Sequence, residues 1–330
     1  MGNDDSFVYG LRVFFSKKLI SMNILITGIH GFVGSNLVEY LKDKHTIYGL
    51  DIVAPEKEGV TKTFSWDDLE AGLVPQVDAI VHLAGKAHDT KNKSAAEVYF
   101  KVNTGLTQKI FDYFMASSAS KFVFFSTAKA AADRVDGILT EEVVSTPLGP
   151  YGESKIKAEE YILSKNLAAE KQFYILRPCM IHGPGNKGNL NLLYNVVRKG
   201  IPWPLGAFDN LRTFTSIENI CFAVEGLMTR EVPSGIYNMG DDEPLSTNEL
   251  IAIICESLGK NPHIWKINKG FMTGMAKFGG WLHLPLNPDR LQKLTENYVA
   301  SNDKIKTALG ISQMPVSARE GLKRTLESFK

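Results

Sequence analysis

A tyrosine and a lysine lie four residues apart in Tyr151-Gly152-Glu153-Ser154-Lys155. Pro150 precedes them and the run to Asn166 is rich in good helix formers, which predicts a helix with both side chains on one face. A phenol has a pKa of about 10, so lowering it to about 7 requires about 4 kcal/mol of phenolate stabilisation. A nearby ammonium could supply much of this, and the phenolate could then take a proton from an alcohol as hydride leaves. The spacing also fits an aromatic ring packed under a lysine stem, so the surrounding elements must decide.

A glycine-rich loop near the start of the chain is the second chemical signal. It reads Gly28-Ile29-His30-Gly31-Phe32-Val33-Gly34 and follows an apolar run, residues 23–27, that predicts a buried parallel strand. Apolar residues then recur at helical spacing. In this order Gly28 permits a tight turn, Gly31 lets backbone amides approach a pyrophosphate, and Gly34 lets the helix pack on the strand. Phe32 and Val33, at the helix start that faces the anion, are therefore predicted cofactor contacts.

An acidic residue ends the next predicted strand, residues 47–51. Asp51 stands about 20 residues after the loop, where a carboxylate can accept hydrogen bonds from the adenosine ribose and would repel a 2′-phosphate. The sequence therefore predicts NAD rather than NADP, with Asp51 and the following Ile52 among the cofactor contacts. The alternative interpretation is that Asp51 only caps a turn.

Further strands are predicted over residues 78–85, 122–125 and 173–176. Strands and helices alternate over 23–178, the pattern of a doubly wound parallel sheet in an α/β fold. Ligands bind such sheets at the carboxyl ends of the strands. The residues delivered there are Leu83, Ala84 and Gly85, small enough to let backbone pass under a cofactor, then Ser126 and Thr127, either of which could bond a substrate oxygen, and lastly Arg177 and Pro178.

The remaining polar residues divide into structural and chemical candidates. His82 ends an apolar strand and is interpreted as a packed core histidine. Asn103 precedes a predicted helix over 104–117 and is interpreted first as its N-cap. Lys86 and His88, in the loop after Gly85, are better candidates for contacting a substrate.

Composition excludes several classes of protein. The 330 residues are 44% hydrophobic and 22% charged with a net charge of +1, so bulk electrostatics gives no indication of a nucleic-acid partner. Cys179, Cys221 and Cys255 are odd in number and lie outside any CxxC pattern. This argues against a disulfide framework and a zinc site, predicts no metal, and fits a reducing cytoplasm.

The chain divides into an extension and two larger parts. Residues 1–21 are interpreted as an extension outside the fold, too short and too charged to span a membrane; a contact with a membrane surface is the alternative. Residues 22–180 form the predicted NAD-binding domain with the catalytic residues. Residues 181–330 form mainly a smaller α/β substrate-binding lobe, with a return to the sheet around 213–240, and the cleft between the lobes is the predicted site.

Taken together, these motifs resemble the extended short-chain dehydrogenase/reductases, in particular the NAD-dependent sugar-nucleotide epimerase/dehydratase family. The resemblance covers about residue 23 to the end. Its carriers are the glycine loop, Asp51, His82-Leu83-Ala84-Gly85, Val102-Asn103, Ser126-Thr127, Tyr151 to Lys155, Leu176-Arg177-Pro178 with Gly183-Pro184-Gly185, and Tyr237-Asn238-Met239-Gly240.

The resemblance implies a Rossmann fold and a role for each matching residue. Tyr151 is the expected acid/base, Lys155 holds the nicotinamide ribose and lowers the tyrosine pKa, and Thr127 bonds the sugar oxygen with Asn103 in support. Arg212 matches a position that binds the nucleotide diphosphate, for which a guanidinium suits through paired bonds to phosphate. Arg290 is a second substrate candidate. A nucleotide-sugar substrate and a homodimer are also implied.

One departure from the family narrows the chemistry. Relatives that are 4,6-dehydratases place an Asp-Glu pair after the catalytic threonine, whereas Thr127 is followed here by Ala128-Lys129. The sequence therefore favours a UDP-hexose or N-acetylhexosamine 4-epimerase in surface polysaccharide biosynthesis. A 4-ketoreductase acting on a 4-keto-6-deoxy-hexosamine nucleotide, a lipid-diphosphate carrier in place of the nucleotide, and a non-catalytic dinucleotide sensor remain alternatives.

Overall fold

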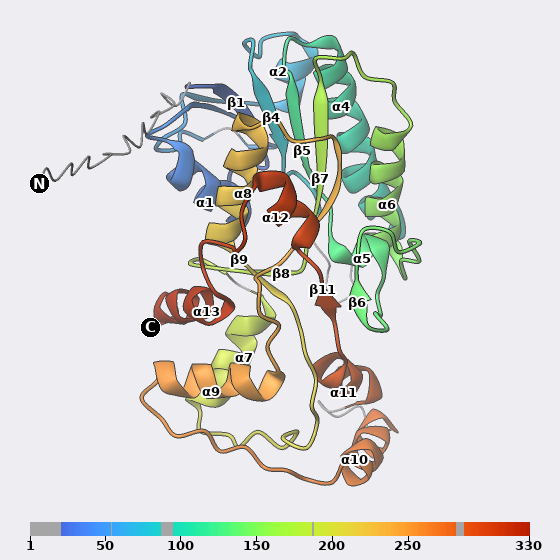
Figure 1. Ribbon diagram of the computed structural model, residues 1–330, viewed down its shortest axis with the longest axis vertical. Coiled ribbons are helices and arrows are strands. Elements are labelled where there is room, and N and C mark those ends of the chain that lie inside the picture. Colours follow the sequence, from blue (N-terminus) through green and yellow to red (C-terminus); the bar gives the residue numbers. More distant parts are fainter. Residues whose placement is uncertain (1–20, 54, 87–94, 187, 282–286) are drawn as a thin grey trace, which may run out of the picture.

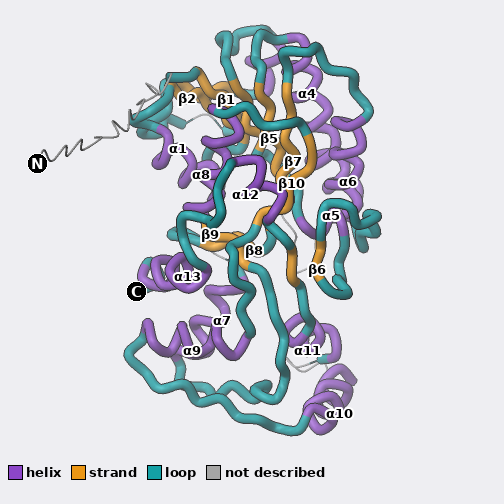
Figure 2. Tube along the Cα trace, in the orientation of Figure 1, coloured by secondary structure: helices purple, strands orange, loops and turns teal. Residues whose placement is uncertain are grey.

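The computed structural model describes residues 21–53, 55–86, 95–186, 188–281 and 287–330. Its centre is a seven-stranded sheet in the order β10-β7-β5-β4-β1-β2-β3, with every neighbouring pair parallel (Figures 1 and 2). The order reverses between β1 and β4, so a crevice opens at their carboxyl ends. The strands are β1 (Asn23–Thr27), β2 (Thr46–Leu50), β3 (Lys62–Phe64), β4 (Ala79–His82), β5 (Lys121–Phe125), β7 (Gln172–Pro178) and β10 (Gly235–Met239).

Helices cover both faces of the sheet, as the alternating pattern predicts (Figure 1). One face packs on α1 (Phe32–Leu41) and α8 (Ile217–Thr229), and the other on α4 (Leu106–Ala116) and α6 (Pro150–Leu163). Successive β1 residues alternate between these two cores, because side chains of a strand point to opposite faces. Four apolar residues that could have served a partner, Ile110, Phe111, Phe114 and Ile162, are fully buried in the protein's own core.

The helical stretch before β5 differs from its prediction. It begins with α3 (Ala96–Tyr99), passes through a π-helical segment, η1 (Phe100–Gly105), and continues as α4. The N-cap interpretation of Asn103 is therefore wrong, because this residue lies inside a helix that started upstream. A π-turn leaves no separate signal in the apolar spacing, which is why the sequence placed the start too late. Short helices α2 (Trp66–Glu70) and α5 (Ala128–Ala131) complete this half.

The later chain builds a second body at one end of the sheet and also contributes to it. Residues after 213 supply α8 and β10 to the sheet layer, while α12 (Asp303–Leu309) packs beside α8. The second body has its own apolar core (Figure 1). Its elements are α7 (Asn189–Arg198), α9 (Thr247–Ser257), α10 (Lys269–Trp281), α11 (Pro288–Thr295) and α13 (Ala318–Glu327), with the strand pair β8 (Met180–His182) and β9 (Phe214–Ser216). The strand pair β6 (Ile138–Leu139) and β11 (Val299–Ala300) packs in a separate small apolar cluster with α5.

Membrane crossing can be examined for the helices in the described ranges. None of them combines the length and the apolar character that a bilayer span requires.

Candidate active site

Tyr151 and Lys155 lie one turn apart near the start of α6. Gly149 takes a φ of 82° just before the helix, and Pro150 occupies its first turn. Lys155 is buried, and its Nζ donates a hydrogen bond to the Phe125 carbonyl oxygen at 2.8 Å. Burial lowers the pKa of Lys155 to about 8. An ammonium therefore lies at the carboxyl end of β5 at neutral pH.

Thr127 approaches Tyr151 from the residues that follow β5. The two side chains share a hydrogen bond, and the Tyr151 ring meets the Tyr99 ring edge-on at 6.3 Å between centroids. Burial raises the pKa of the Tyr151 phenol, whereas the hydrogen bond with Thr127 acts in the opposite direction. With these neighbours the phenol is protonated at neutral pH, so its use as a base requires further positive charge beside it.

Ser126 is directed elsewhere, to a buried ion pair that the sequence interpretation missed. The Ser126 hydroxyl donates to Glu159, and the Nε of Arg177 lies 3.1 Å from each Glu159 carboxylate oxygen. All three side chains are buried. Of the two hydroxyls after β5, only that of Thr127 faces Tyr151. Glu159 follows Lys155 by one further turn of α6, but an acidic residue on a predicted helix is normally assigned to solvent.

Asn103 ties the loop after β4 to α6. Its side-chain Oδ1 accepts from the Lys86 amide at 2.7 Å, while Nδ2 donates to the Lys86 carbonyl at 3.2 Å and to the Ser154 hydroxyl at 3.0 Å. Asn103 makes these contacts from within the π-helical segment η1, and π-helical segments are frequent at functional sites. The Lys86 ammonium lies 5.9 Å from the centre of the Tyr99 ring. His88 lies outside the described residues.

The glycine loop forms a tight cradle between β1 and α1. Gly28 has a φ of 68°, and a Cβ built on it would lie 2.8 Å from the Ala84 amide nitrogen. A Cβ on Gly34 would lie 2.6 Å from the Gly28 carbonyl oxygen, so only glycine lets the helix pack this closely. Gly31 precedes the helix without a side-chain cap, which leaves the first-turn amides of Phe32 and Val33 for a ligand.

Asp51 lies beside this cradle at the end of β2. Its two carboxylate oxygens accept the amides of His30 at 3.2 Å and Ile52 at 2.8 Å. The Ile52 side chain is exposed. The carboxylate thus lies at the rim of the loop, close to where the adenosine ribose is predicted. It also holds the loop through His30, a contact that the turn-capping interpretation did not include.

The carboxyl end of β4 forms the floor between cradle and Tyr151. The amides of Leu83 and Ala84 both donate to the Thr27 hydroxyl, at 3.2 and 3.0 Å. A Cβ on Gly85 would lie 3.2 Å from the Lys155 ammonium and 3.0 Å from the Asn103 Oδ1 oxygen. His82 is buried between two threonine hydroxyls, as a core histidine should be. Pro178, at the end of β7, remains a predicted cofactor contact.

These residues fit NAD in shape and charge. The cradle excludes side chains, uncapped helix amides face an anion, and a carboxylate stands at the ribose end. The assignment of individual residues to the cofactor stays a prediction.

The two predicted arginines lie farther along the chain in the second body. Arg212 is half-buried between Leu245 and Tyr298, and its Nη1 donates to the Lys293 carbonyl at 2.6 Å. Arg290 has an exposed side chain in the first turn of α11. The predicted role of both arginines in diphosphate binding stays a prediction.

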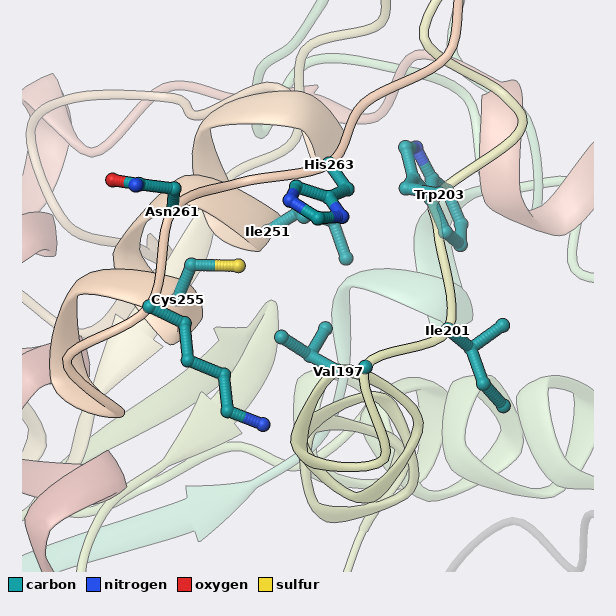
Figure 3. Close-up of a pocket in the computed structure, with 9 residues that line it drawn as sticks. Val197, Ile201, Trp203, Ile251, Cys255, Asn261 and His263 are labelled. Atoms are coloured by element: carbon teal, nitrogen blue, oxygen red, sulfur yellow. The ribbon is translucent and has the colours of Figure 1, made fainter.

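A cavity of about 290 Å³ lies apart from the predicted site, between α7 and α9 (Figure 3). Its walls include Val197, Trp203, Ile251, Cys255 and Lys260. Burial raises the pKa of the Cys255 thiol, which makes it a poor nucleophile. The cavity contains none of the residues predicted to carry chemistry.

A second cavity, of about 220 Å³, lies between α5 and α11. Lys129, two residues after Thr127, lines it, and it mixes basic with acidic side chains. The others that line it are Asp133, Arg134, Leu148, Gln292, Lys293 and Glu296.

Comparisons with known proteins agree with this geometry. UDP-glucose 4-epimerase of Vibrio cholerae is 26% identical over 322 residues, which cover 93% of this chain and 95% of that one. N-acetyl-alpha-D-glucosaminyl-diphospho-ditrans,octacis-undecaprenol 4-epimerase of Escherichia coli O157:H7 is 26% identical over 326 residues, covering 92% and 94%. The structure of Bordetella bronchiseptica WbmG in complex with NAD is similar with a TM-score of 0.74, at 18% identity, covering 95% and 96%.

The sequence pattern of the NAD dependent epimerase/dehydratase family matches residues 24–240, about two thirds of the chain. The match spans the cradle, Tyr151, Lys155 and the last strand of the sheet. The predicted enzyme class and the predicted cofactor, NAD, are thereby confirmed. This chain belongs to the NAD dependent epimerase/dehydratase family.

Proposed function

We propose that this enzyme epimerises carbon 4 of a UDP-linked hexose or N-acetylhexosamine. The observation that carries the proposal is the meeting of Thr127, Tyr151 and Lys155 at the carboxyl edge of the sheet, next to a cradle that fits NAD. A sugar hydroxyl held between Thr127 and Tyr151 would lie beside the predicted nicotinamide position.

The residues of the chain would handle the proton. Tyr151 takes the proton of the 4-hydroxyl and, after the ketose has turned to present the other face of carbon 4 for hydride return, gives the proton back to the same sugar oxygen, which Thr127 holds. Lys155, released from the Phe125 carbonyl, holds the nicotinamide ribose and supplies the positive charge that the phenolate needs. Bound NAD would accept hydride from carbon 4 and return it. Asn103 fixes the loop below them through Lys86.

One feature argues against dehydration, another reaction of the family. Elimination of water across carbons 5 and 6 needs its own acid and base, whereas the residues after Thr127 are Ala128 and Lys129. A 4-ketoreductase would use the same tyrosine, lysine and threonine, so it stays the alternative. A non-catalytic sensor has no need of this combination.

The wider role belongs to the same proposal. Arg212 and Arg290 would bind the diphosphate, and the relative from Escherichia coli, a 4-epimerase of an N-acetylated sugar, supports an N-acetylhexosamine. Such a sugar would serve surface polysaccharide assembly in the cytoplasm. The homodimer expected by resemblance completes the proposal.

Cofactor content separates epimerase from reductase. The protein would be purified without added cofactor and denatured, and the released dinucleotide measured by chromatography. We expect about one equivalent of NAD per chain and conversion of UDP-N-acetylglucosamine added alone. Little bound cofactor, together with reduction of a 4-keto sugar nucleotide by added NADH or NADPH, would favour the reductase.

A further inference from the structure

His82 lies at the carboxyl end of β4, and both of its ring nitrogens have buried hydrogen-bond partners. Its Nδ1 lies 2.7 Å from the Thr27 hydroxyl oxygen, which the register of β1 and β4 places beside it. Its Nε2 lies 2.9 Å from the hydroxyl oxygen of Thr107, in the first turn of α4. All three side chains are buried. A histidine that only fills the core needs no more than this, but both hydroxyls make further contacts.

The hydrogens of this chain of contacts have one possible order. The Thr27 oxygen accepts hydrogen bonds from the amides of Leu83 at 3.2 Å and Ala84 at 3.0 Å, which occupy both of its lone pairs. Its own hydrogen therefore points to the Nδ1 of His82, so this nitrogen carries no proton. The ring then has its proton on Nε2 and donates it to the Thr107 oxygen.

The surroundings of the ring favour the same neutral form. Burial and the charge of Lys155 both hold the pKa of His82 well below its ordinary value. The Phe124 ring stacks on His82 at 5.7 Å between centroids, and the Lys155 ammonium lies 4.9 Å from the centre of the same phenyl ring. A second cation at this place would be repelled by the first. Charge and hydrogen bonding therefore agree on a ring with one proton.

The Thr107 end of the chain of contacts reaches the π-helical segment η1. The Thr107 hydroxyl donates to the Asn103 carbonyl oxygen at 2.6 Å. The Asn103 side chain in turn bonds to the amide and the carbonyl of Lys86. It also donates to the Ser154 hydroxyl, which donates to the Tyr151 carbonyl oxygen at 2.8 Å. The same hydrogen bonds therefore continue into the helix that carries the predicted acid/base.

These contacts hold both ends of one short segment, residues 83–86. Its first two amides donate to Thr27, and its last residue bonds to the side chain of Asn103. Between these ends, a Cβ on Gly85 would lie 3.2 Å from the Lys155 ammonium. The backbone of the segment thus passes close to the group that is predicted to hold the nicotinamide ribose.

We infer that His82 is a positioning residue for the bound cofactor. With its proton on Nε2, the ring joins Thr27 to Thr107, and so fixes both ends of residues 83–86, the floor of the predicted nicotinamide site. The inference rests on the cofactor placement in the proposed function, but not on whether the enzyme is an epimerase or a reductase.

Exchange of bound NAD tests the inference without any sugar substrate. The holoenzyme would be loaded with isotope-labelled NAD, and the rate at which an excess of unlabelled NAD replaces it would be measured. Thr107→Val keeps the side-chain shape but removes the hydroxyl, and we expect exchange to become about tenfold faster, as loss of one buried hydrogen bond allows. Thr107→Ser keeps the hydroxyl and should exchange at close to the wild-type rate.

Thr325 provides a matched control in the second body. Its buried hydroxyl lies 2.9 Å from the Nδ1 of His182 and donates to the Gly321 carbonyl oxygen at 2.8 Å. It therefore repeats the histidine and backbone contacts of Thr107 in α13. Thr325→Val should lower the free energy of unfolding in urea about as much as Thr107→Val does, but should leave NAD exchange unchanged.

NMR of protein labelled with nitrogen-15 in its seven histidines tests the ring itself. The signals of His82 are those that change most in Thr107→Val. Between pH 6 and pH 8 we expect a proton on Nε2 and none on Nδ1. A proton on Nδ1 would overturn the inference. Wild-type NAD exchange in Thr107→Val, or equally fast exchange in Thr325→Val, would also overturn it. Because no sugar is used, these results are independent of which reaction the enzyme catalyses.

Discussion

Tyr151 lies in surroundings that favour its neutral form, and this defines what its neighbours must do. Burial and the Tyr99 ring oppose the phenolate, while Thr127 favours it. The Lys155 ammonium lies on the same helix face but donates to the Phe125 carbonyl. Proton transfer therefore requires the Lys155 ammonium and the positive charge of oxidised nicotinamide to lie close enough to stabilise the phenolate.

Replacing the acid/base removes turnover without removing the cofactor. Tyr151→Phe should lower kcat by about 10³-fold, because a positioned acid/base contributes about 10²–10⁴-fold. Bound NAD should stay at the wild-type level, measured after denaturation. Tyr161→Phe, on the same helix, should remain active. Near-normal turnover in Tyr151→Phe would contradict the role given to this residue.

The buried lysine makes stability depend on pH. Its pKa is about 8 in the fold, against about 10.4 in an unfolded chain, so its charge destabilises the fold by about 3 kcal/mol below pH 8. This cost disappears as pH rises past about 10.4. Lys155→Met, stripped of cofactor, should be more stable than wild type at pH 7 by about 2 kcal/mol after the lost hydrogen bond is counted.

Urea unfolding at pH 7 and pH 10 would measure this difference, which should shrink at the higher pH. Lys157→Met, at an exposed position of the same helix, should show no such dependence. A stability difference that is independent of pH would show that Lys155 is not held as a buried cation.

Catalytic side chains were predictable from the sequence where their spacing along the chain indicates that they lie together. Tyr151 and Lys155 are one turn apart because four residues make about one turn. The Glu159–Arg177 pair was not predictable, because it joins a helix to a strand end and charged residues are normally exposed. Asn103 was misassigned because its π-turn changes backbone bonding without changing residue types.

At the scale of elements, the shape of the glycine-loop cradle depends on how closely β1, α1 and β4 pack together. Glycine is needed at position 28 for two reasons: its φ is positive, and the backbone of residue 84 approaches it closely. Gly72 has a similar φ, 70°, with nothing within 4 Å of an added Cβ. Comparing substitutions at the two glycines therefore separates the cost of backbone strain from the cost of a steric clash with neighbouring backbone.

Alanine at these two glycines should have unequal effects. Gly28→Ala should lower the free energy of unfolding by more than about 3 kcal/mol and abolish bound NAD, whereas Gly72→Ala should cost about 1–2 kcal/mol and keep it. Urea unfolding and cofactor content would be measured for both. Equal losses would mean that the close approach to β4 is unimportant.

Five strands of the main sheet, β1, β2, β4, β5 and β7, were predictable because each is a short, largely buried apolar run. Strand β3 was not, because its three residues include an exposed lysine. Strands β6, β8, β9 and β11 were not predictable either. They have two or three residues each and pair with segments far away in the chain. No local periodicity can report such pairing.

At the scale of the whole molecule, the chain returns to the sheet after building part of the second body. α8 covers one face of the sheet through Ile220, Val224 and Leu227, and β10 pairs with β7. The predicted division at residue 180 therefore separates parts that share one core.

A fragment of residues 22–180 should accordingly fail to fold alone. It lacks α8 and β10, so the apolar face of β1, β4 and β5 would stay exposed. We expect no cooperative urea transition in circular dichroism and no retained NAD, whereas a chain of residues 22–330 should show both. A fragment that unfolds cooperatively and carries NAD would show that the first part is autonomous.

The most direct test of the account follows the hydrogen on carbon 4. UDP-N-acetylglucosamine deuterated at that carbon would be given to the purified enzyme without added cofactor, and the product analysed by NMR. The account predicts the 4-epimer with deuterium retained at carbon 4, because hydride leaves and returns within one site. Loss of deuterium to solvent in the epimer, or no epimer from an enzyme that carries NAD, would contradict it.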